Sequence, residues 1–222
     1  MTSSNEGDRS CTPSPRHPSE VRERLIVFTR YPEAGKTKTR LIPVLGAEGA
    51  AKLQREMTEQ TLARVQNCDR ARSVEIHFCG GSLQQMQNWL GDRWTYREQE
   101  RGDLGQRMAS ALRSAFAEGM ERAVIIGIDC PDLGANLMSE AFDTLKTCDL
   151  VLGRAADGGY YLIGLRKPIP ALFEGIAWGT SQVLQQTVAI AEALGCAIAY
   201  LPLLHDIDTP EDLPLLQNSC PT

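Results

Sequence analysis

The stretch Ala123-Val-Ile-Ile-Gly-Ile-Asp129-Cys-Pro-Asp132-Leu133 decides how this chain folds. Its first six residues carry no polar side chain and are rich in β-branched ones, which is typical of a central parallel strand covered by helices on both faces. Asp129 and a proline turn end the run. Ligands bind at the carboxyl ends of strands in open α/β sheets, so we expect Asp129 to hold a metal ion or a substrate hydroxyl. Taken alone, Asp129 fits an N-cap of the next turn equally well.

Short apolar runs alternate with amphipathic stretches along the whole chain after Arg24. Apolar residues at three- and four-residue steps predict helices, and short β-branched runs predict strands. Repeated alternation of the two is typical of a layered, largely parallel α/β sheet. We expect strands near 25–28, 73–78, 94–97, 123–129, 149–153, 160–165 and 197–201, and helices near 50–65, 83–90, 104–116, 136–146 and 184–194.

Length, charge and cysteine content narrow the class of protein. A chain of 222 residues is long enough for one large α/β domain, which we expect over residues 22–222. The net charge of −5 argues against a surface for nucleic acid or anionic membranes, because both need an excess of basic residues. Seven cysteines without a C-x-x-C pair fit neither a disulfide framework nor a zinc site, so the expected location is a reducing cytoplasm.

Residues 1–21 differ in composition from the rest of the chain. They are rich in Ser and Pro, which predicts a disordered N-terminal arm. They contain no apolar core of a signal peptide, and no apolar run in the chain approaches membrane-spanning length. The sequence therefore predicts no membrane insertion, and it leaves the oligomeric state open, a homodimer included.

A cluster of basic residues follows the first predicted strand. Lys36, Lys38 and Arg40 stand at steps of two after Gly35, so they project to one side if the segment is extended. Local cations in an acidic protein suit phosphate, because Arg binds oxygens bidentately and Lys supplies a point charge. The segment is not a P-loop, since Arg30 stands where that motif needs a glycine. A solvated basic loop is the alternative interpretation.

Three further stretches lie at predicted strand or helix ends. Residues 156–160 set a carboxylate beside two glycines, which permits close approach of a ligand, with a plain turn as the alternative. Residues 205–213 follow the last strand and bring Asp208 as a second carboxylate toward a metal, with helix capping as the alternative. Residues 102–107 open a helix whose N-terminal amides suit a base or phosphate, with capping by Asp103 as the alternative.

Six motifs, in order along the chain after residue 22, carry a family resemblance. They are Phe28-Thr-Arg-Tyr-Pro-Glu-Ala-Gly-Lys-Thr-Lys-Thr-Arg-Leu41, Gly102-Asp-Leu-Gly-Gln-Arg107, Gly127-Ile-Asp-Cys-Pro-Asp-Leu133, Ala156-Asp-Gly-Gly-Tyr-Tyr161, Trp178-Gly-Thr-Ser181 and Asp206-Ile-Asp-Thr-Pro-Glu-Asp-Leu213. Together they resemble the bacterial arsenosugar-biosynthesis-type glycosyltransferases of the GT-A, or nucleotide-diphospho-sugar transferase, superfamily. The resemblance implies a Rossmann-like three-layer α/β/α fold with a mostly parallel mixed sheet, a nucleotide-bound donor and a divalent cation, Mg²⁺ or Mn²⁺.

Two of these segments, residues 38–41 and 206–212, also resemble guanylyl- and cytidylyltransferases. Many sugar-nucleotide-forming enzymes carry Leu-Ala-Ala-Gly-x-Gly after the first strand, whereas residues 28–32 here contain no glycine. Such a loop depends on side-chain cations and suits two phosphates better than three. The usual Asp-x-Asp of glycosyltransferases is replaced by Asp129-Cys-Pro-Asp132, which favours Asp129 as the metal ligand. Cys130 is not expected to act as a nucleophile, because no positive neighbour in the sequence lowers its pKa.

The motifs and the resemblance assign a role to each candidate residue. Asp129 and Asp208 are the expected metal ligands, and Asp157 and Asp129 the catalytic residues, with His205 as a rival base. The expected nucleotide-binding residues are Phe28, Arg30, Gly35, Lys36, Lys38, Arg40, Gly105 and Gln106. The expected acceptor-binding residues are Gly158, Gly159, Tyr160, Trp178 and Thr180.

The leading functional hypothesis is a metal-dependent glycosyltransferase that moves a sugar from a nucleoside diphosphate sugar to a small-molecule acceptor. The first alternative is a nucleotidyltransferase that uses a nucleoside triphosphate and releases pyrophosphate. The second is a catalytically silent nucleotide-binding protein. The sequence does not name the nucleotide, the sugar, the acceptor or the stereochemical outcome.

Overall fold

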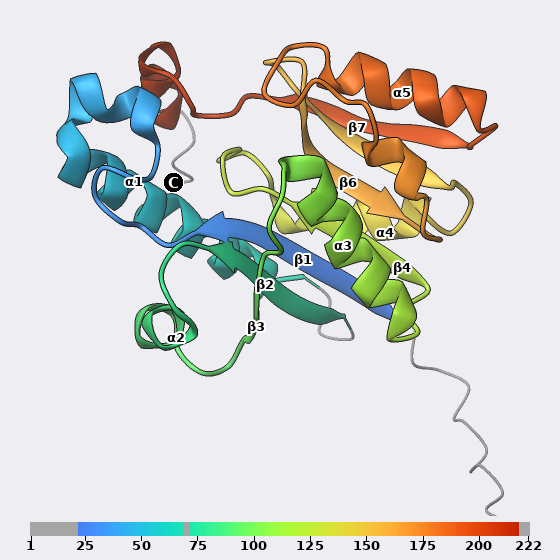
Figure 1. The fold of residues 1–222 in the computed structure, drawn as a ribbon, viewed down its shortest axis with the longest axis horizontal. Helices are drawn as coiled ribbons and strands as arrows, with labels where there is room; N and C mark the ends of the chain where they lie inside the picture. The colour runs from blue at the N-terminus through green and yellow to red at the C-terminus, as the bar shows by residue number, and fades with distance from the viewer. Residues whose placement is uncertain (1–21, 69–71, 218–222) are drawn as a thin grey trace, which may run out of the picture.

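The structure, a computed structural model, describes residues 22–68 and 72–217. Its centre is a seven-stranded sheet in the order β3-β2-β1-β4-β6-β5-β7 (Figure 1). The only antiparallel neighbours in it are the two pairs that include β6, so the predicted mostly parallel mixed sheet is confirmed. The arm predicted over 1–21 lies outside the described residues. The strands are β1 (Glu23–Arg30), β2 (Ser73–Cys79), β3 (Thr95–Glu98), β4 (Arg122–Ile126), β5 (Leu150–Ala155), β6 (Tyr160–Leu165) and β7 (Ile198–Leu204).

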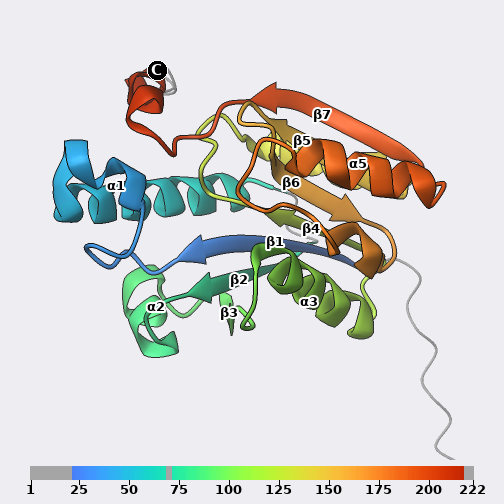
Figure 2. The same cartoon turned by 45° about the horizontal axis from the view of Figure 1, so that its top comes forward.

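Helices cover both faces of the sheet and make three layers (Figures 1 and 2). Side chains alternate between the faces along each strand, so Leu25 and Val27 pack on one side and Ile26 on the other. Among the described residues, no helix is long and apolar enough to cross a membrane. On the first side lie α1 (Ile42–Val65), α2 (Leu83–Leu90) and α4 (Ala135–Thr144), and on the second α3 (Leu104–Ala117) and α5 (Val183–Ala193).

The strand directions bring four loops to one edge of the sheet. β1 and β4 are parallel neighbours, so residues 31–41 and 127–134 leave the sheet side by side. β5 runs the same way as β4 because both are antiparallel to β6, and β7 is parallel to β5. The turn at 156–159 and the segment after β7 therefore reach that edge as well. All the charged motifs of the sequence except the start of α3 come from these loops.

Two local details differ from the sequence prediction. β4 ends at Ile126, so Asp129 lies three residues beyond the strand, in the loop that leads to α4. The basic segment after β1 is not extended, because Lys38 adopts a left-handed conformation (φ 42°, ψ 48°) and a 3₁₀ helix (η1, Thr39–Leu41) follows it. The three cations therefore do not project in parallel, and each makes different contacts.

Candidate active site

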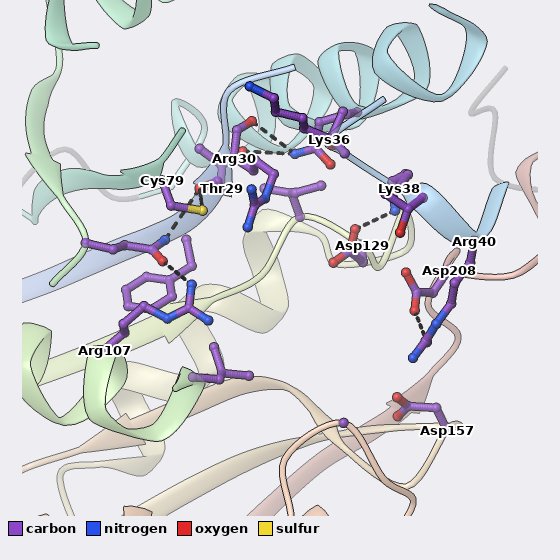
Figure 3. A pocket seen from close by; sticks show the side chains of 18 residues that line it. Thr29, Arg30, Lys36, Lys38, Arg40, Cys79, Arg107, Asp129, Asp157 and Asp208 are labelled. Carbon is purple, nitrogen blue, oxygen red and sulfur yellow. Dashed lines mark hydrogen bonds and ion pairs between the residues drawn. The ribbon is translucent and has the colours of Figure 1, made fainter. Parts of the chain in front are cut away.

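Two ion pairs join the basic loop after β1 to acidic residues at the same sheet edge (Figure 3). Lys38 Nζ lies 2.7 Å from Asp129 Oδ1, and Arg40 Nη1 lies 2.5 Å from Asp208 Oδ2. Lys38 also donates a 2.6 Å hydrogen bond to the carbonyl oxygen of Ile207, whose own backbone N–H donates to the carbonyl oxygen of Asp129 at 2.8 Å. Because the Lys38 side chain is only 3% exposed, its ammonium group binds three loops together inside the protein.

The sequence predicted that Lys38 and Arg40 bind phosphate and that Asp129 and Asp208 bind a metal. The structure brings all four residues together, but it pairs each cation with one of the acids. The buried Lys38 ammonium is engaged by protein oxygens, whereas the Arg40 side chain is 62% exposed. Lys38 thus has the contacts of a positioning residue, and Arg40 those of a group that a ligand reaches.

A cavity of about 520 Å³ lies beside these ion pairs, and we call it the cationic cavity. Phe28, near the end of β1, contributes to its wall beside the cations, and its nucleotide-binding role stays a prediction. Gly35 is not among its lining residues and lies in a turn at φ 80°, which favours glycine. Lys36 is 67% exposed and pairs with Glu33 at 2.7 Å. The cations that line the cavity are Arg30, Lys36, Lys38, Arg40 and Arg107.

Arg107 is a site residue that the sequence analysis missed. It lies on the far side of the cavity from Arg40 (Figure 3), in the first turn of α3. Its Nη1 donates to Gln99 Oε1 at 3.0 Å, and its Nε donates to the carbonyl oxygen of Asp103 at 3.2 Å. Gln99 is itself fixed through a 2.9 Å hydrogen bond to the carbonyl oxygen of His77. The motif of residues 102–107 was a signal for Arg107, whereas Gln99 has no signal of its own in the sequence.

Gly105 and Gln106 have structural contacts at the start of α3. The Asp103 side chain accepts from Gln106 N–H at 2.8 Å, and Gln106 Oε1 accepts from Asp103 N–H at 3.0 Å. This reciprocal pair is a capping box, so the capping interpretation of Asp103 is confirmed. A Cβ atom on Gly105 would lie 2.5 Å from the Trp178 ring, so glycine lets Trp178 pack on α3. Neither residue lines the cationic cavity, and their nucleotide-binding role stays a prediction.

A second cavity, of about 240 Å³, adjoins the first, and we call it the acidic cavity. Its walls hold four carboxylates and no Lys or Arg. Trp178 and Tyr160 supply aromatic walls and meet edge to face, with ring centroids 6.5 Å apart. Gly159 and Thr180, both predicted acceptor residues, also line it. The residues common to the two cavities are Leu104, Asp129, Asp157, Gly179 and Asp208.

Asp157 stands at the junction of the two cavities. Its Oδ1 accepts a 2.7 Å hydrogen bond from the backbone N–H of Gly159, so the residue forms a tight turn and faces both cavities at once. Gly158 does not line either cavity. Its φ is 89°, and a Cβ atom there would lie 2.3 Å from the carbonyl oxygen of Ser181, so only glycine fits. His205, the rival base, is exposed and lines neither cavity.

Asp206 is a second site residue that the sequence analysis did not single out. It lines the acidic cavity, and burial, together with the negative charges of Asp157, Asp212 and Asp129, raises the pKa of Asp206 to about 6. The same surroundings act on Cys130, where burial and neighbouring carboxylates raise the pKa of the thiol far above its usual range. A thiol of that pKa stays protonated, which agrees with the expectation that Cys130 is not a nucleophile.

The side chains fit only one kind of metal site. In residues 22–68 and 72–217, no group of three or more His, Cys, Asp or Glu side chains is placed to hold a metal ion. Asp129 and Asp208, however, both line a cavity rich in cations. Mg²⁺ commonly uses one or two carboxylates when it also binds phosphate oxygens of a substrate. The two carboxylates thus fit an ion shared with a diphosphate, not an ion held by the protein alone.

A mostly parallel mixed sheet with its charged loops at one edge defines the class, the nucleotide-diphospho-sugar transferase fold. A crystal structure of a "putative nucleotide-diphospho-sugar transferase" from Desulfovibrio desulfuricans G20 is 36% identical in sequence to this chain. It superposes with a TM-score of 0.83, over 88% of this chain and 86% of that one. The sequence profile of DUF2064, described as an uncharacterized protein conserved in bacteria, matches residues 61–180. The chain belongs to this family. The search of curated proteins found no match.

More distant structures share the fold alone. CMP:2-keto-3-deoxy-manno-octonic acid synthetase complexed with CTP is 8% identical, with a TM-score of 0.57 over 89% of this chain and 97% of that one. A mannosyltransferase from Pyrobaculum calidifontis, in complex with GDP-Man and Mn²⁺, is 16% identical. It has a TM-score of 0.51 over 85% of this chain and 57% of that one. Enzymes of two different reaction types therefore share this architecture.

Proposed function

We propose that this protein is a metal-dependent glycosyltransferase that moves a sugar from a nucleoside diphosphate sugar to a small acceptor. The observation that supports this reaction is the pair of adjoining cavities with opposite charge. The cationic cavity suits a diphosphate, the acidic cavity suits a hydroxyl-bearing acceptor, and the wall between them carries Asp129, Asp157 and Asp208. Group transfer needs two such sites that meet at one point, since the reacting atoms must approach to about 3–3.5 Å.

In the donor site, Arg40, Lys36 and Arg107 bind the phosphate oxygens and hold the donor in place. Asp129 and Asp208 are the residues that hold a divalent cation, Mg²⁺ or Mn²⁺, jointly with the diphosphate. A bound cation stabilises negative charge on the leaving nucleoside diphosphate. Lys38 keeps Asp129 at the junction through the contacts described above. The nucleotide-binding roles of Phe28, Gly35, Gly105 and Gln106 belong to this proposal as predictions.

In the acceptor site, Asp157 is the proposed general base. Its carboxylate lies at the junction and is exposed, so it reaches a hydroxyl that enters from the acidic cavity. It takes the hydroxyl proton as the acceptor oxygen attacks the sugar carbon. Trp178, Tyr160 and Thr180 orient the acceptor, and the turn at Gly158 and Gly159 fixes the position of Asp157. An arsenosugar-type activity within the family, and a cytoplasmic location, are parts of this proposal.

Nucleotidyl transfer is the second candidate function, and one observation favours it. The sequence argument counted three cations, enough for two phosphates, but the cationic cavity is also lined by Arg30 and Arg107. Lys38 is bound by protein oxygens, and the other four cations suit a triphosphate as well as a diphosphate. The fold shared with a CTP-bound synthetase is compatible with this chemistry.

The two reactions release different products. We would incubate the full chain with nucleoside diphosphate sugars and, separately, with nucleoside triphosphates, with and without Mn²⁺, and measure nucleoside diphosphate and pyrophosphate. We expect slow, metal-dependent hydrolysis of a sugar nucleotide to the nucleoside diphosphate, without pyrophosphate, and loss of this activity in Asp129→Asn. Pyrophosphate release from a triphosphate without turnover of any sugar nucleotide identifies a nucleotidyltransferase. Binding of a nucleotide without either product identifies the catalytically silent alternative.

A further inference from the structure

The charge of the acidic cavity carries information about the acceptor. Of its four carboxylates, Asp129 and Asp208 are each paired with a cation that belongs to the neighbouring cavity. Asp157 and Asp206 have no ion pair with any Lys or Arg among the described residues. The cavity wall itself contains neither Lys nor Arg. Away from the wall shared with the cationic cavity, the acceptor site is therefore a negative region whose own lining offers no Lys or Arg to an incoming anion.

A phosphate or carboxylate on the acceptor would meet these carboxylates at close range. Like charges that face each other across an interface oppose binding strongly, and more so where the site is partly buried. Hydroxyl groups, in contrast, donate hydrogen bonds to carboxylate oxygens, which act only as acceptors. The cationic cavity, a few residues away, has the opposite composition and is where an anionic group would bind.

The size of the acidic cavity and the chemistry of its walls narrow the class of acceptor further. At about 240 Å³, the acidic cavity is smaller than typical sites for drug-sized ligands, which begin near about 300 Å³. Trp178 and Tyr160 offer ring surfaces for apolar C–H groups, and the carboxylates Asp157 and Asp206 offer acceptors for hydroxyls. A compact molecule with both C–H faces and several hydroxyls matches these walls.

We propose that the acceptor is a small polyhydroxylated molecule without a phosphate or carboxylate group, bound in the acidic cavity between Trp178 and the carboxylates of Asp157 and Asp206. The proposal rests on the proposed transferase function for the identity of the cavity as the acceptor site. It also separates the two candidate reactions, because a nucleotidyl transfer that makes a phosphoanhydride needs a phosphate as the attacking group.

The test compares neutral molecules with their anionic twins. We would measure binding to the full chain by saturation-transfer NMR, using glycerol against glycerol phosphate, glucose against glucose 6-phosphate, and glucose against glucuronate. ADP, GDP, CDP and UDP are first compared by the rise in melting temperature that each causes, and the one with the largest rise is kept at saturation so that phosphates cannot bind in the cationic cavity. We expect at least one neutral probe to bind at least about tenfold more tightly than its anionic twin. Tighter binding of the anionic twins, or no binding of any neutral probe, overturns the proposal.

A variant that removes one charge tests whether the preference for neutral over anionic probes arises in the acidic cavity. Asp206→Asn removes one negative charge at nearly constant size, and we expect the neutral-over-anionic ratio to fall by about three- to tenfold. The matched control is Glu211→Gln, an exposed acid on the following segment that lines neither cavity, which leaves the ratio unchanged. If Asp206→Asn does not fold, Thr180→Lys adds a cation to the same wall, with Thr180→Gln as its control. An unchanged ratio in the folded charge variant overturns the assignment.

The binding and turnover measurements distinguish failure of the acceptor proposal from failure of the transferase proposal. If no sugar nucleotide is ever hydrolysed but neutral probes still bind in preference, the proposed glycosyl transfer is wrong while the charge selectivity of the cavity holds. If sugar nucleotides are turned over and the anionic twins both bind and accelerate the reaction, the transferase proposal holds and the acceptor class is wrong.

Discussion

Ion pairs gather at both ends of the parallel strands, and the two groups differ in how completely the protein satisfies them. At the amino ends, the side chain of Glu75 is 6% exposed and lies 3.0 Å from Arg24 Nη1, 3.0 Å from Arg97 Nε and 3.0 Å from His77 Nε2. At the carboxyl ends, Asp129 is 48% exposed and has one cation partner, Lys38. The same residue types thus form a closed group at one end and an open group at the other.

The closed group holds strands together, and we call it the amino-end cluster. Arg24 of β1 reaches both Glu75 of β2 and Glu118 beyond α3, and Arg97 of β3 reaches the same two acids. Glu23, at the start of β1, pairs with Arg72 and Arg122 in the same way, which completes the cluster. Since these acids are surrounded by protein cations, little of their charge is left for a ligand. An exposed carboxylate at the carboxyl ends of the strands is therefore a better indicator of a functional site than a buried acid that protein cations surround.

The largest expected effect comes from opening the amino-end cluster. Glu75→Gln leaves Arg24 and Arg97 with only the partly exposed Glu118 as a counter-charge. Breaking a buried pair costs about 3–5 kcal/mol. We expect that loss in the free energy of unfolding, measured by urea denaturation, with nucleotide affinity unchanged in the folded protein. Glu100→Gln is the control, because its exposed side chain lies 3.9 Å from Arg113 and should matter little. Wild-type stability of Glu75→Gln would show that the cluster is not structural.

The same residue sets a pH dependence of stability. Burial alone would raise the pKa of Glu75, but the hydrogen bond from His77 and the charges of Arg24 and Arg97 outweigh it and hold the pKa below its usual value. An acid with a lowered pKa stabilises the fold above its unfolded pKa, about 4.3, and loses that contribution as the pH falls through the folded pKa. The stability gap between wild type and Glu75→Gln should be constant from pH 7 to 5 and shrink below about pH 4. A gap that widens on acidification contradicts this assignment.

The next effect, at the open end, comes from the buried lysine of the basic loop. Lys38→Met removes the buried ammonium that holds Asp129 and Ile207, and charged hydrogen bonds are worth about 1.5–3 kcal/mol. We expect a loss of about 10- to 100-fold in metal-dependent affinity for a nucleoside diphosphate, measured by calorimetry, while nucleoside affinity is retained. Lys52→Met is the control, since the Lys52 side chain is 75% exposed on α1 and lines neither cavity, so nucleotide affinity should stay at the wild-type level. Equal losses in both variants would remove the positioning role of Lys38.

The sequence predicted which loops meet but not which side chains do. Apolar periodicity located the strands, and the parallel arrangement then placed Asp129, Asp157 and Asp208 at one edge, as the structure has them. The Lys38–Asp129 pair depends on a left-handed backbone at Lys38, a conformation that no local pattern predicted. Arg107 joins the site because α3 packs in one core cluster with Ile26 of β1 and Ile125 of β4. Strand order and burial arise from contacts distant in sequence, and periodicity reports only contacts along the chain.

The smallest expected effect on stability comes from Arg40. It tests whether the ion pairs at the carboxyl ends of the strands are available to a ligand. The Arg40 and Asp208 side chains are 62% and 40% exposed, so Arg40→Gln should change the free energy of unfolding by no more than about 1 kcal/mol. Its affinity for a nucleoside diphosphate should nevertheless fall by about tenfold, because an exposed guanidinium is free to leave Asp208 and bind phosphate.

Wild-type affinity should weaken between 0.05 and 0.5 M salt, roughly the range over which surface charges become screened, and the Arg40→Gln affinity should depend less on salt. The stability contributed by Glu75, being buried, should hardly change over the same range. The contrary result is an Arg40→Gln variant that loses as much stability as Glu75→Gln and keeps wild-type nucleotide affinity and salt dependence. In that case the ion pairs at the carboxyl ends of the strands are structural, like those at the amino ends.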